Sequence, residues 1–475
     1  MRVFHSESSS ERQLLWILLA AAILRLGAII FFHPPLLSDS KEYHDIAQSV
    51  VHGEGFTIDG KPTAFRLPGY PIILAATYFI FGYSRIPIAL VQLLADLASC
   101  VLVFAIGRKL ISEKVGIVAA WIFALFPIQI LYVPHVMTET LFTTIFLATI
   151  WLSLQDYLTA KKSVVIGLLV GAGILIRSTA LILPLVIYIH RWKGGEEAKK
   201  GLRSLSIIGI MALLVVSPWL IRNLVQFERF SLTSNGGVNF WMGSHAGATG
   251  SYSYPQNNPL TTVQNEFERS DLGVRLGLEF IRSHPFEYAE VVAKKFVRFF
   301  SPDYWLMMTL EYKPEWAFAP NASTIFSQFS PFDILLLHLP YAAVLFMGVF
   351  GLVCGRPEDE RGEFLFRLLI LSWLLVHLVV VADARYRFPI MPVFFLSAAY
   401  CREMLRTGTL RRSTLRLAVA STLCLVLVGG WLSEYMFIRA RAVPSVVLDH
   451  SSFSRAHVFL PPKQAPELEF GPKIR

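Results

Sequence analysis

The chain has 475 residues, of which 54% are hydrophobic and 16% charged, and its formal net charge is +9. A soluble protein of this length carries more charge, so the composition excludes a soluble enzyme and indicates an integral membrane protein. The basic residues stand in short clusters between apolar runs, an arrangement that sets membrane topology, so we exclude a nucleic-acid partner. None of the four cysteines forms a Cys-x-x-Cys pair, which predicts neither a disulfide framework nor a zinc–thiolate site.

Apolar runs along the chain predict an all-α membrane bundle with about eleven crossings. The predicted spans are 14–32, 86–106, 115–133, 141–158, 164–176, 179–189, 205–221, 334–353, 364–382, 388–400 and 415–437. The first run is too long for the core of a signal peptide and lacks a small-residue cleavage site, so we expect it to remain as the first span.

Loop charge predicts the topology of these spans. With the N-terminus inside, every inside loop is rich in lysine and arginine, as the positive-inside rule requires. The short run 70–81 would invert this pattern if it crossed the membrane, and it is well below the roughly 20 residues that a crossing needs. We therefore interpret it as a helix along the outer interface, within a first periplasmic loop of residues 33–85.

Three parts follow along the chain. Residues 1–224 form a membrane module that includes the loop 33–85 and is expected to carry the chemistry. Residues 225–333 form a large periplasmic loop, in which a Gly-rich turn region precedes an amphipathic helical pattern over 272–300 that is broken near Pro285. Residues 334–475 form the C-terminal membrane helices and a tail.

Asp39 begins the most polar stretch of the first outer loop. Apolar residues at helical spacing predict a helix that ends at Gly53, with Asp39 in its first turn and Glu42 three residues later. One interpretation is a capping pair that meets the positive end of the helix. The other is a general base beside a reacting hydroxyl or amine. The two roles are compatible.

Basic side chains on the outer side form a second group of candidates. Lys61 and Arg66 lie in the same loop, where a cation either contacts lipid headgroups or clamps the phosphate of a lipid-linked substrate. Charge parity places further arginines outside, where the positive-inside rule does not require them: Arg177, Arg222, Arg385 and Arg387. Together they indicate an anionic substrate such as a phosphate or pyrophosphate, whereas local pairing, for example of Arg385 with Asp383, could explain any single one.

His135 and Glu139 lie at the outer ends of the third and fourth predicted spans. A carboxylate at the start of a membrane helix is costly unless it is paired or used, so Glu139 is either a capping or hydrogen-bonded group or part of a catalytic cavity. Asp39, His135 and Glu139 are also the candidate ligands for a divalent metal ion, should the protein bind one. The spacing of His135 and Glu139 alone does not make a metal site.

A series of short motifs follows in order along the chain. They are Asp39 with Tyr43 and Ala47, Gly53-x-Gly55-Phe56, Arg66-x-Pro68-Gly69-Tyr70-Pro71, Thr138-Glu139, Pro218-Trp219 with Arg222-Asn223, Gly237-x-Asn239 with Gly243, and Arg385-Tyr386-Arg387-x-Pro389. Together they resemble the bacterial dolichyl-phosphate-mannose protein mannosyltransferase-like family, glycosyltransferase family 39. That family shares the GT-C fold with the aminoarabinose transferase of lipid A.

The resemblance implies a GT-C type bundle in the inner (plasma) membrane, with an active site that faces the periplasm. It implies a glycosyltransferase that moves a sugar from a polyprenyl-phosphate donor, with inversion, to a glycan, lipid or protein acceptor. The acidic base of the first outer loop then falls on Asp39, and Glu139 joins it as a catalytic candidate. Membrane lipids are the other expected partner. The expected substrate-binding residues are Lys61, Arg66, Tyr70, Arg177, Arg222, Asn239, Arg385, Tyr386 and Arg387.

A polytopic transporter or a flippase for lipid-linked sugars is the alternative class. Such a protein places ionisable residues near the middle of the membrane and contains paired broken helices in two related halves. The sequence contains no internal repeat, and its informative charges cluster on one face. A non-catalytic assembly protein is the third interpretation, and for it the replacement of Asp39 by Asn should be silent.

Overall fold

The computed structural model describes residues 3–36, 38–255, 257–303, 331–355, 360–410 and 413–440. Within these ranges the chain is mostly helical, with 17 α-helices and one two-stranded hairpin, so the predicted all-α class is confirmed. Residues 304–330 of the predicted periplasmic loop and the tail from 441 to 475 lie outside the described residues.

The elements follow the predicted apolar runs closely. The first part contains α1 (Val3–Phe31), α2 (Asp39–Val51), β1 (Thr57–Ile58), β2 (Lys61–Pro62), α3 (Gly69–Phe81), α4 (Ile86–Leu110), α5 (Glu113–Leu125), α6 (Pro127–Tyr132), α7 (Glu139–Ser153), α8 (Ala160–Ile176), the 3₁₀ helix η1 (Ser178–Ile182), α9 (Leu183–Lys193) and α10 (Ala198–Phe227). The second part contains α11 (Gly236–Met242), η2 (Pro259–Thr262), α12 (Glu266–Ser283), α13 (Pro285–Phe300), α16 (Pro331–Val353), α17 (Glu360–Val379), η5 (Ala384–Ile390), α18 (Met391–Thr407) and α19 (Thr414–Ala440).

Five of the described helices are long and apolar enough to cross a membrane, and the chain is an integral membrane protein. These stretches are Ser10–Phe31, Ile86–Leu110, Ala198–Phe227, Arg361–Val379 and Thr414–Glu434. Shorter apolar helices cover Gly69–Phe81, Glu139–Ser153 and His338–Val353. The total of about eleven crossings stays a prediction.

Prolines set several of the boundaries. The predicted span 115–133 is two helices, because Pro127 has no N–H to donate and Phe126 before it is extended, which ends α5 at Leu125. The predicted break near Pro285 is confirmed, since α12 ends at Ser283 and α13 begins at Pro285. The run 70–81 is the short helix α3, as predicted.

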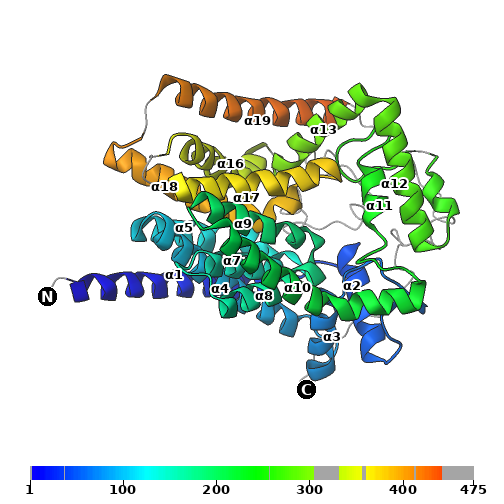
Figure 1. Ribbon diagram of the computed structural model, residues 1–475. Helices are drawn as coiled ribbons and strands as arrows, with labels where there is room; N and C mark the ends of the chain where they lie inside the picture. The colour runs from blue at the N-terminus through cyan, green and yellow to red at the C-terminus, as the bar shows by residue number, and fades with distance from the viewer. Residues whose placement is uncertain are drawn as a thin grey trace, which may run out of the picture.

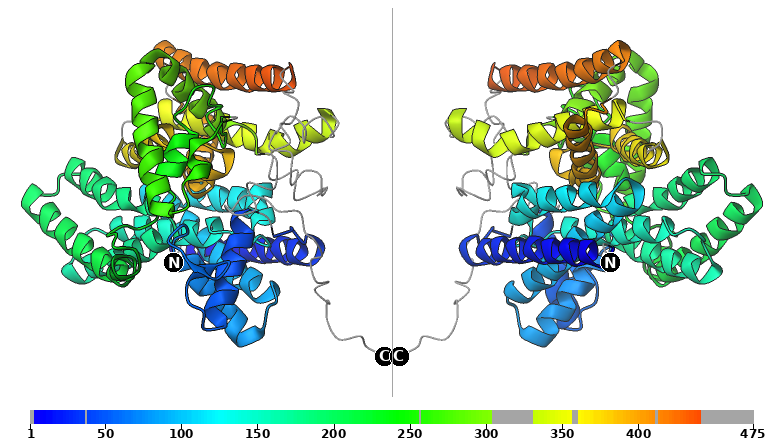
Figure 2. Two further views of the ribbon diagram at one scale, coloured as in Figure 1. Left: turned by 90° about the vertical axis from the view of Figure 1, so that its right-hand side faces the viewer. Right: turned by 90° about the vertical axis from the view of Figure 1, so that its left-hand side faces the viewer.

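The long helices lie side by side across Figure 1, and α2, α3, α11 and α12 gather at one end, on the right of the view. In both Figure 1 and Figure 2, α19 lies along the top of the bundle, and α1 lies on the opposite side, toward the bottom. The two predicted outer loops meet at the right-hand end, where Glu266 of α12 accepts hydrogen bonds from the Thr63 hydroxyl at 2.8 Å and the Ala64 N–H at 2.7 Å. The segments that charge parity assigned to one side of the membrane therefore lie together.

One ion pair is buried inside the bundle. Arg25 of α1 lies 2.5 Å from Asp96 of α4, and their side chains are 0% and 2% exposed. The guanidinium of Arg25 also donates to the carbonyls of Ala124, at 2.5 Å, and Phe123, at 3.2 Å, at the end of α5. The Pro127 break removes the N–H that would follow in the helical ladder, and the Phe123 carbonyl keeps only a 3.4 Å hydrogen bond from the Phe126 N–H. Arg25 therefore caps the end of α5 while Asp96 neutralises Arg25.

We predict that Asp96→Ala destabilises the protein by about 3–5 kcal/mol, because it leaves a buried guanidinium without a counter-charge. Thermal and denaturant unfolding in detergent measure this loss. Asp156→Ala is the control, since the Asp156 side chain is 76% exposed in its pair with Lys109 and its removal should change little. Equal unfolding curves for the two variants would contradict a structural role for the Arg25–Asp96 pair.

Candidate active site

Asp39 lies at the centre of a cluster of charged side chains. One of its carboxylate oxygens accepts a hydrogen bond from Arg66 Nη2 at 2.6 Å, and the other lies 2.7 Å from Arg385 Nη2. Arg66 also pairs through its Nε with Glu42, one turn further along α2. The side chains of Asp39 and Arg66 are 13% and 15% exposed, so the cluster is largely shielded from solvent but open to a ligand.

The first outer loop holds Asp39 and Arg66 in place through its backbone. Ser38 adopts a φ of 49° and directs the chain into α2, so Asp39 projects from the first turn of the helix. Arg66 comes two residues before Pro68, in the motif that starts α3. Gly69 lets this start pack against the end of α8, since a Cβ there would lie 2.8 Å from the Leu175 carbonyl oxygen.

Arg385 comes from the other end of the chain. It is carried by η5, whose first N–H groups are capped by Asp383: the Asp383 side chain accepts a hydrogen bond from the Arg385 N–H at 3.2 Å. The predicted local contact with Asp383 thus involves the backbone of Arg385, while the guanidinium reaches Asp39. Charge parity had placed both residues outside, and the structure brings them into contact.

The charges of the cluster fix its ionisation. Burial alone would raise the pKa of Asp39, but the guanidinium groups of Arg385 and Arg66 outweigh burial and hold that pKa well below its usual range. Burial would lower the pKa of Arg66 and Arg385, whereas contact with Asp39 raises both well above the ordinary arginine value. All three groups are therefore charged at neutral pH, and Asp39 in this arrangement is a weak base.

A second ion pair adjoins the first. Glu139, which is 1% exposed, lies 2.9 Å from Arg177 Nη1, and the same nitrogen donates to the Thr138 hydroxyl at 3.0 Å. The Tyr386 ring lies within cation–π range of two guanidinium carbons, at 5.6 Å from Arg177 and 5.4 Å from Arg385. Tyr386 therefore joins the two ion pairs into one site.

Six charged side chains of this site are paired with one another. The three carboxylates belong to Asp39, Glu42 and Glu139, and the three guanidinium groups to Arg66, Arg177 and Arg385. Such a set of paired side chains can accept a phosphate if some guanidinium groups change partner, because arginine binds carboxylate and phosphate with the same fork of N–H donors.

The two acidic residues in the first turn of α2, Asp39 and Glu42, were open to a capping interpretation. In the structure the carboxylates of Asp39 and Glu42 are both bound to Arg66, and Asp39 also to Arg385. Their position in the first turn still favours the helix, since negative charge is stabilising at its N-terminus.

Other expected substrate-binding residues lie away from Asp39. Tyr70 is fully buried and donates through its hydroxyl to Gln92 at 3.1 Å. Arg222 donates to the carbonyls of Phe56 and Thr63, at 3.1 Å and 2.8 Å, and so holds the first outer loop.

Three further expected residues also lie elsewhere. Arg387 donates to the Phe299 carbonyl at 2.8 Å, and its guanidinium lies over the Tyr341 ring. Lys61 is exposed on the β1–β2 hairpin. Asn239 lies on α11, which packs against α12 so closely that a Cβ on Gly273 would collide with the Gly237 carbonyl. Arg387 thus serves the packing of the bundle.

The three candidate metal ligands do not come together. Among the described residues no group of three or more His, Cys, Asp or Glu side chains could hold a metal ion. Asp39 and Glu139 are each bound to arginine, and burial followed by the charge of Arg85 lowers the pKa of His135 to about 4. The residues as arranged therefore do not fit a divalent ion.

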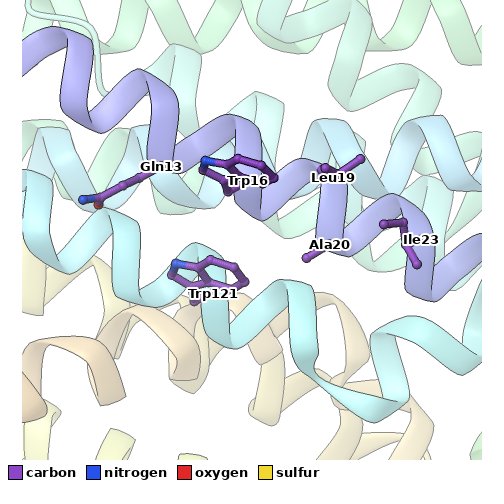
Figure 3. Close-up of a pocket in the computed structure, with 6 residues that line it drawn as sticks. All are labelled: Gln13, Trp16, Leu19, Ala20, Ile23 and Trp121. Carbon is purple, nitrogen blue, oxygen red and sulfur yellow. The ribbon is translucent and has the colours of Figure 1, made fainter.

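A cavity of about 520 Å³ lies elsewhere, between α1 and α5. Figure 3 shows Trp16 of α1 opposite Trp121 of α5, with Gln13, Leu19, Ala20 and Ile23 of α1 completing the lining. Trp16 and Ile23 are 65% and 59% exposed, as expected of side chains that face lipid. This groove lies on the exposed surface of α1 and α5, and none of its lining residues belongs to the Asp39 cluster.

Sequence reasoning missed Tyr252. Its hydroxyl accepts a hydrogen bond from Arg385 Nη2 at 2.6 Å and is also hydrogen-bonded to the Tyr386 hydroxyl. Ser251 beside it donates to Asp383 at 3.0 Å. The only signal in the sequence was the Gly-rich turn just before these residues, and it gives no indication of which segment the turn approaches.

Residues 61–221 match the protein family described as "Dolichyl-phosphate-mannose-protein mannosyltransferase". This segment contains the Arg66 to Pro71 motif, Thr138-Glu139 and Pro218-Trp219, so the resemblance seen in the sequence is confirmed. A comparison with curated proteins gave no match.

Solved membrane proteins show a distant likeness. The Archaeoglobus fulgidus oligosaccharyltransferase in its apo form has a TM-score of 0.48 and 13% identity over 97% of this chain and 62% of its own. ArnT from Cupriavidus metallidurans in the apo state has a TM-score of 0.47 and 12% identity, over 90% of this chain and 73% of its own. The same ArnT bound to undecaprenyl phosphate has a TM-score of 0.42 and 13% identity, over 82% and 77%. At such scores no role passes from them to this chain, which spans about three fifths of the oligosaccharyltransferase.

We predict that Arg66→Lys lowers stability at pH 7, because a single ammonium group cannot reproduce the two-sided contact of Arg66 with Asp39 and Glu42. In the unfolded chain the pKa of Asp39 is 3.8, and in the folded protein it is lower. Ionised Asp39 therefore stabilises the folded protein at pH values above 3.8, and this stabilisation is lost as the pH falls below that value. The difference in melting temperature between wild type and Arg66→Lys should therefore shrink below about pH 4. A difference that is constant from pH 7 to pH 3 would contradict this linkage.

Proposed function

We propose that the chain is a membrane glycosyltransferase, which moves a sugar from a polyprenyl-phosphate donor to an acceptor at the outer, periplasmic face of the plasma membrane. The observation that carries the proposal is the position of Asp39 between Arg66 and Arg385, a carboxylate and two phosphate-binding cations in one partly open cluster. The family match over residues 61–221 supports the same class of reaction.

In the proposed reaction a hydroxyl oxygen of the acceptor attacks the anomeric carbon of the donor sugar. The bond from that carbon to the phosphate oxygen breaks, and its electron pair leaves with polyprenyl phosphate. The proton of the hydroxyl passes to the Asp39 carboxylate. A single displacement of this kind inverts the anomeric configuration, and it requires a base on the acceptor side and positive charge on the leaving-group side.

The geometry links donor binding to activation of the base. Asp39 is a weak base while both guanidinium groups contact it, because they lower its pKa. A donor phosphate competes for these same N–H donors. When Arg66 and Arg385 turn toward the phosphate, they stabilise the departing charge and at the same time release Asp39 to accept a proton.

The outer location rests on the distribution of charge. Basic clusters between the spans fit the inside loops, and the two long outer segments meet at one end of the bundle through Glu266 and Thr63. The expected partners are a polyprenyl-phosphate sugar, a glycan, lipid or protein acceptor, and the surrounding membrane lipids. In a membrane-embedded site the prenyl chain lies in the bilayer, so a soluble donor pocket is not required.

We predict that Asp39→Asn lowers the initial rate of sugar transfer by about 10²–10⁴-fold, the usual contribution of a general base. The assay follows transfer from a panel of polyprenyl-phosphate sugars in liposomes, with products identified by mass spectrometry. Asp45→Asn is the matched control: Asp45 lies on the same helix in an exposed pair with Lys41. Folding of both variants is checked by melting temperature.

The outcomes of this assay are distinct. If Asp39→Asn and Asp45→Asn transfer sugar at similar rates, Asp39 is not the base. Movement of the lipid-linked sugar across the membrane without any glycosylated product would instead favour a flippase.

Two arginines of one motif provide a further test. We predict that Arg385→Gln raises the KM for the donor at least several-fold, because it removes a phosphate-binding group next to Asp39. Arg387→Gln should lower the melting temperature and leave the donor KM of the folded fraction close to wild type, since Arg387 contacts the Phe299 carbonyl and Tyr341. Steady-state kinetics, with the concentration of folded protein measured for each variant, compare the donor KM of Arg385→Gln with that of Arg387→Gln. A donor KM that rises equally in both variants would show that Arg387 also contacts the donor.

A further inference from the structure

We propose that residues 243–253, which we call the strap, position Arg385 against Asp39. The strap belongs to the second outer segment and follows α11, whereas Arg385 follows α17. This inference rests on the proposed function, because it concerns the geometry of the same site. The Gly-rich turn of residues 247–250 thereby acquires a role in positioning Arg385.

Three consecutive residues of the strap bind the segment that carries Arg385. The Gly250 carbonyl accepts a hydrogen bond from the Ala382 N–H at 3.0 Å. Ser251 donates to the Asp383 carboxylate at 3.0 Å, and this carboxylate caps η5 through the Arg385 N–H. The Tyr252 hydroxyl accepts from the Arg385 guanidinium at 2.6 Å. The strap therefore holds the segment at its backbone, at its helix cap and at the guanidinium itself.

The strap is in turn held by α13. Gly250 has a φ of +87°, and a Cβ at this position would lie 2.7 Å from the Lys295 backbone nitrogen and 2.8 Å from the Lys294 carbonyl carbon. At its start, a Cβ on Gly243 would collide with the Val380 carbonyl oxygen. Lys295, which is fully buried, donates to the neighbouring Val379 carbonyl at 3.1 Å. Only glycine allows this closeness at both ends of the strap.

The ends of the strap also lie close to each other. The Nε2 atom of His245 lies 3.1 Å from the Ser253 carbonyl oxygen, and its Nδ1 lies 2.8 Å from the Ala246 carbonyl oxygen. The strap is therefore a compact turn wedged between α13 and the segment from Val379 to Arg385. Movement of the turn changes where the Arg385 guanidinium can reach.

Displacing the strap has a specific electrostatic consequence. Among the described residues, Arg66 and Arg385 are the cations in contact with Asp39. The nearby phenols of Tyr43, Tyr252 and Tyr386 are neutral at pH 7, and burial raises their pKa further. If Arg385 withdraws, only Arg66 remains on Asp39. The pKa of Asp39 then rises, and the donor phosphate loses one of its two cations.

The test compares Gly250→Ala with Gly247→Ala. Both glycines lie in the strap with positive φ, at +87° and +75°, so alanine meets a similar backbone cost at either position. A Cβ on Gly247 has nothing within 4 Å, whereas a Cβ on Gly250 meets the backbone of α13. We expect Gly250→Ala to raise the donor KM several-fold. We also expect the acid limb of the pH profile of kcat/KM to move to higher pH by about 1–3 units, because one neighbouring arginine lowers the pKa of an aspartate by that amount. Gly247→Ala should resemble wild type in both.

A second variant tests the same proposal if Gly250→Ala does not fold. Tyr252→Phe keeps the ring and removes only the hydroxyl that accepts from Arg385, so it should shift KM and the acid limb in the same direction by a smaller amount. If Gly250→Ala and Tyr252→Phe both match Gly247→Ala in KM and in pH profile, the strap does not position Arg385.

Limited proteolysis in detergent provides a readout without activity. Gly250→Ala should be cleaved faster within residues 243–253 than Gly247→Ala, because its turn no longer fits against α13. Equal cleavage of the two variants would overturn the proposed anchoring. A wild-type protein that transfers no sugar would refute the proposed function and leave the proteolysis result to decide on the strap.

Discussion

The contact of one carboxylate with two guanidinium groups organises one end of this molecule. Asp39 is shielded from water, and a shielded charge is costly unless it is neutralised and hydrogen-bonded. Its two partners are separated by more than 300 residues, and each needs its own support. The start of α3 packs on α8 behind Arg66, and the strap holds the segment of Arg385. The architecture of both outer segments follows from the need to keep these three side chains together.

Much of the fold could be predicted because the membrane imposes simple rules on sequence. Apolar runs predicted most of the helices, and prolines predicted breaks between helices such as the one at Pro285. Charge parity was equally informative for the site. It placed Asp39, Arg66 and Arg385 on one side of the membrane. Charged side chains at one end of a bundle have few possible partners of opposite charge. Their contact in the structure therefore follows from topology and pairing of opposite charges.

The direction of individual side chains could not be predicted. Arg385 and Arg387 are two residues apart, yet one reaches Asp39 and the other the Phe299 carbonyl, because η5 turns them to different sides. Arg222 belonged to the same set of outer cations and instead binds two carbonyls of the first loop. Tyr252 was missed for a related reason: its role depends on a close backbone approach at Gly250, which is a property of the packed structure.

The Arg25–Asp96 pair has a consequence for how the protein enters the membrane. Arg25 lies within the first span, and its counter-charge lies 71 residues later in α4. An unpaired arginine near the centre of a membrane helix costs about 2.5–3.5 kcal/mol during insertion. Until α4 is inserted and supplies Asp96, the first helix carries this cost unpaired, offset by its apolar residues, whose mean hydropathy is 2.5. Pairing with Asp96 then removes this cost, which favours the association of α1 with α4 inside the bilayer.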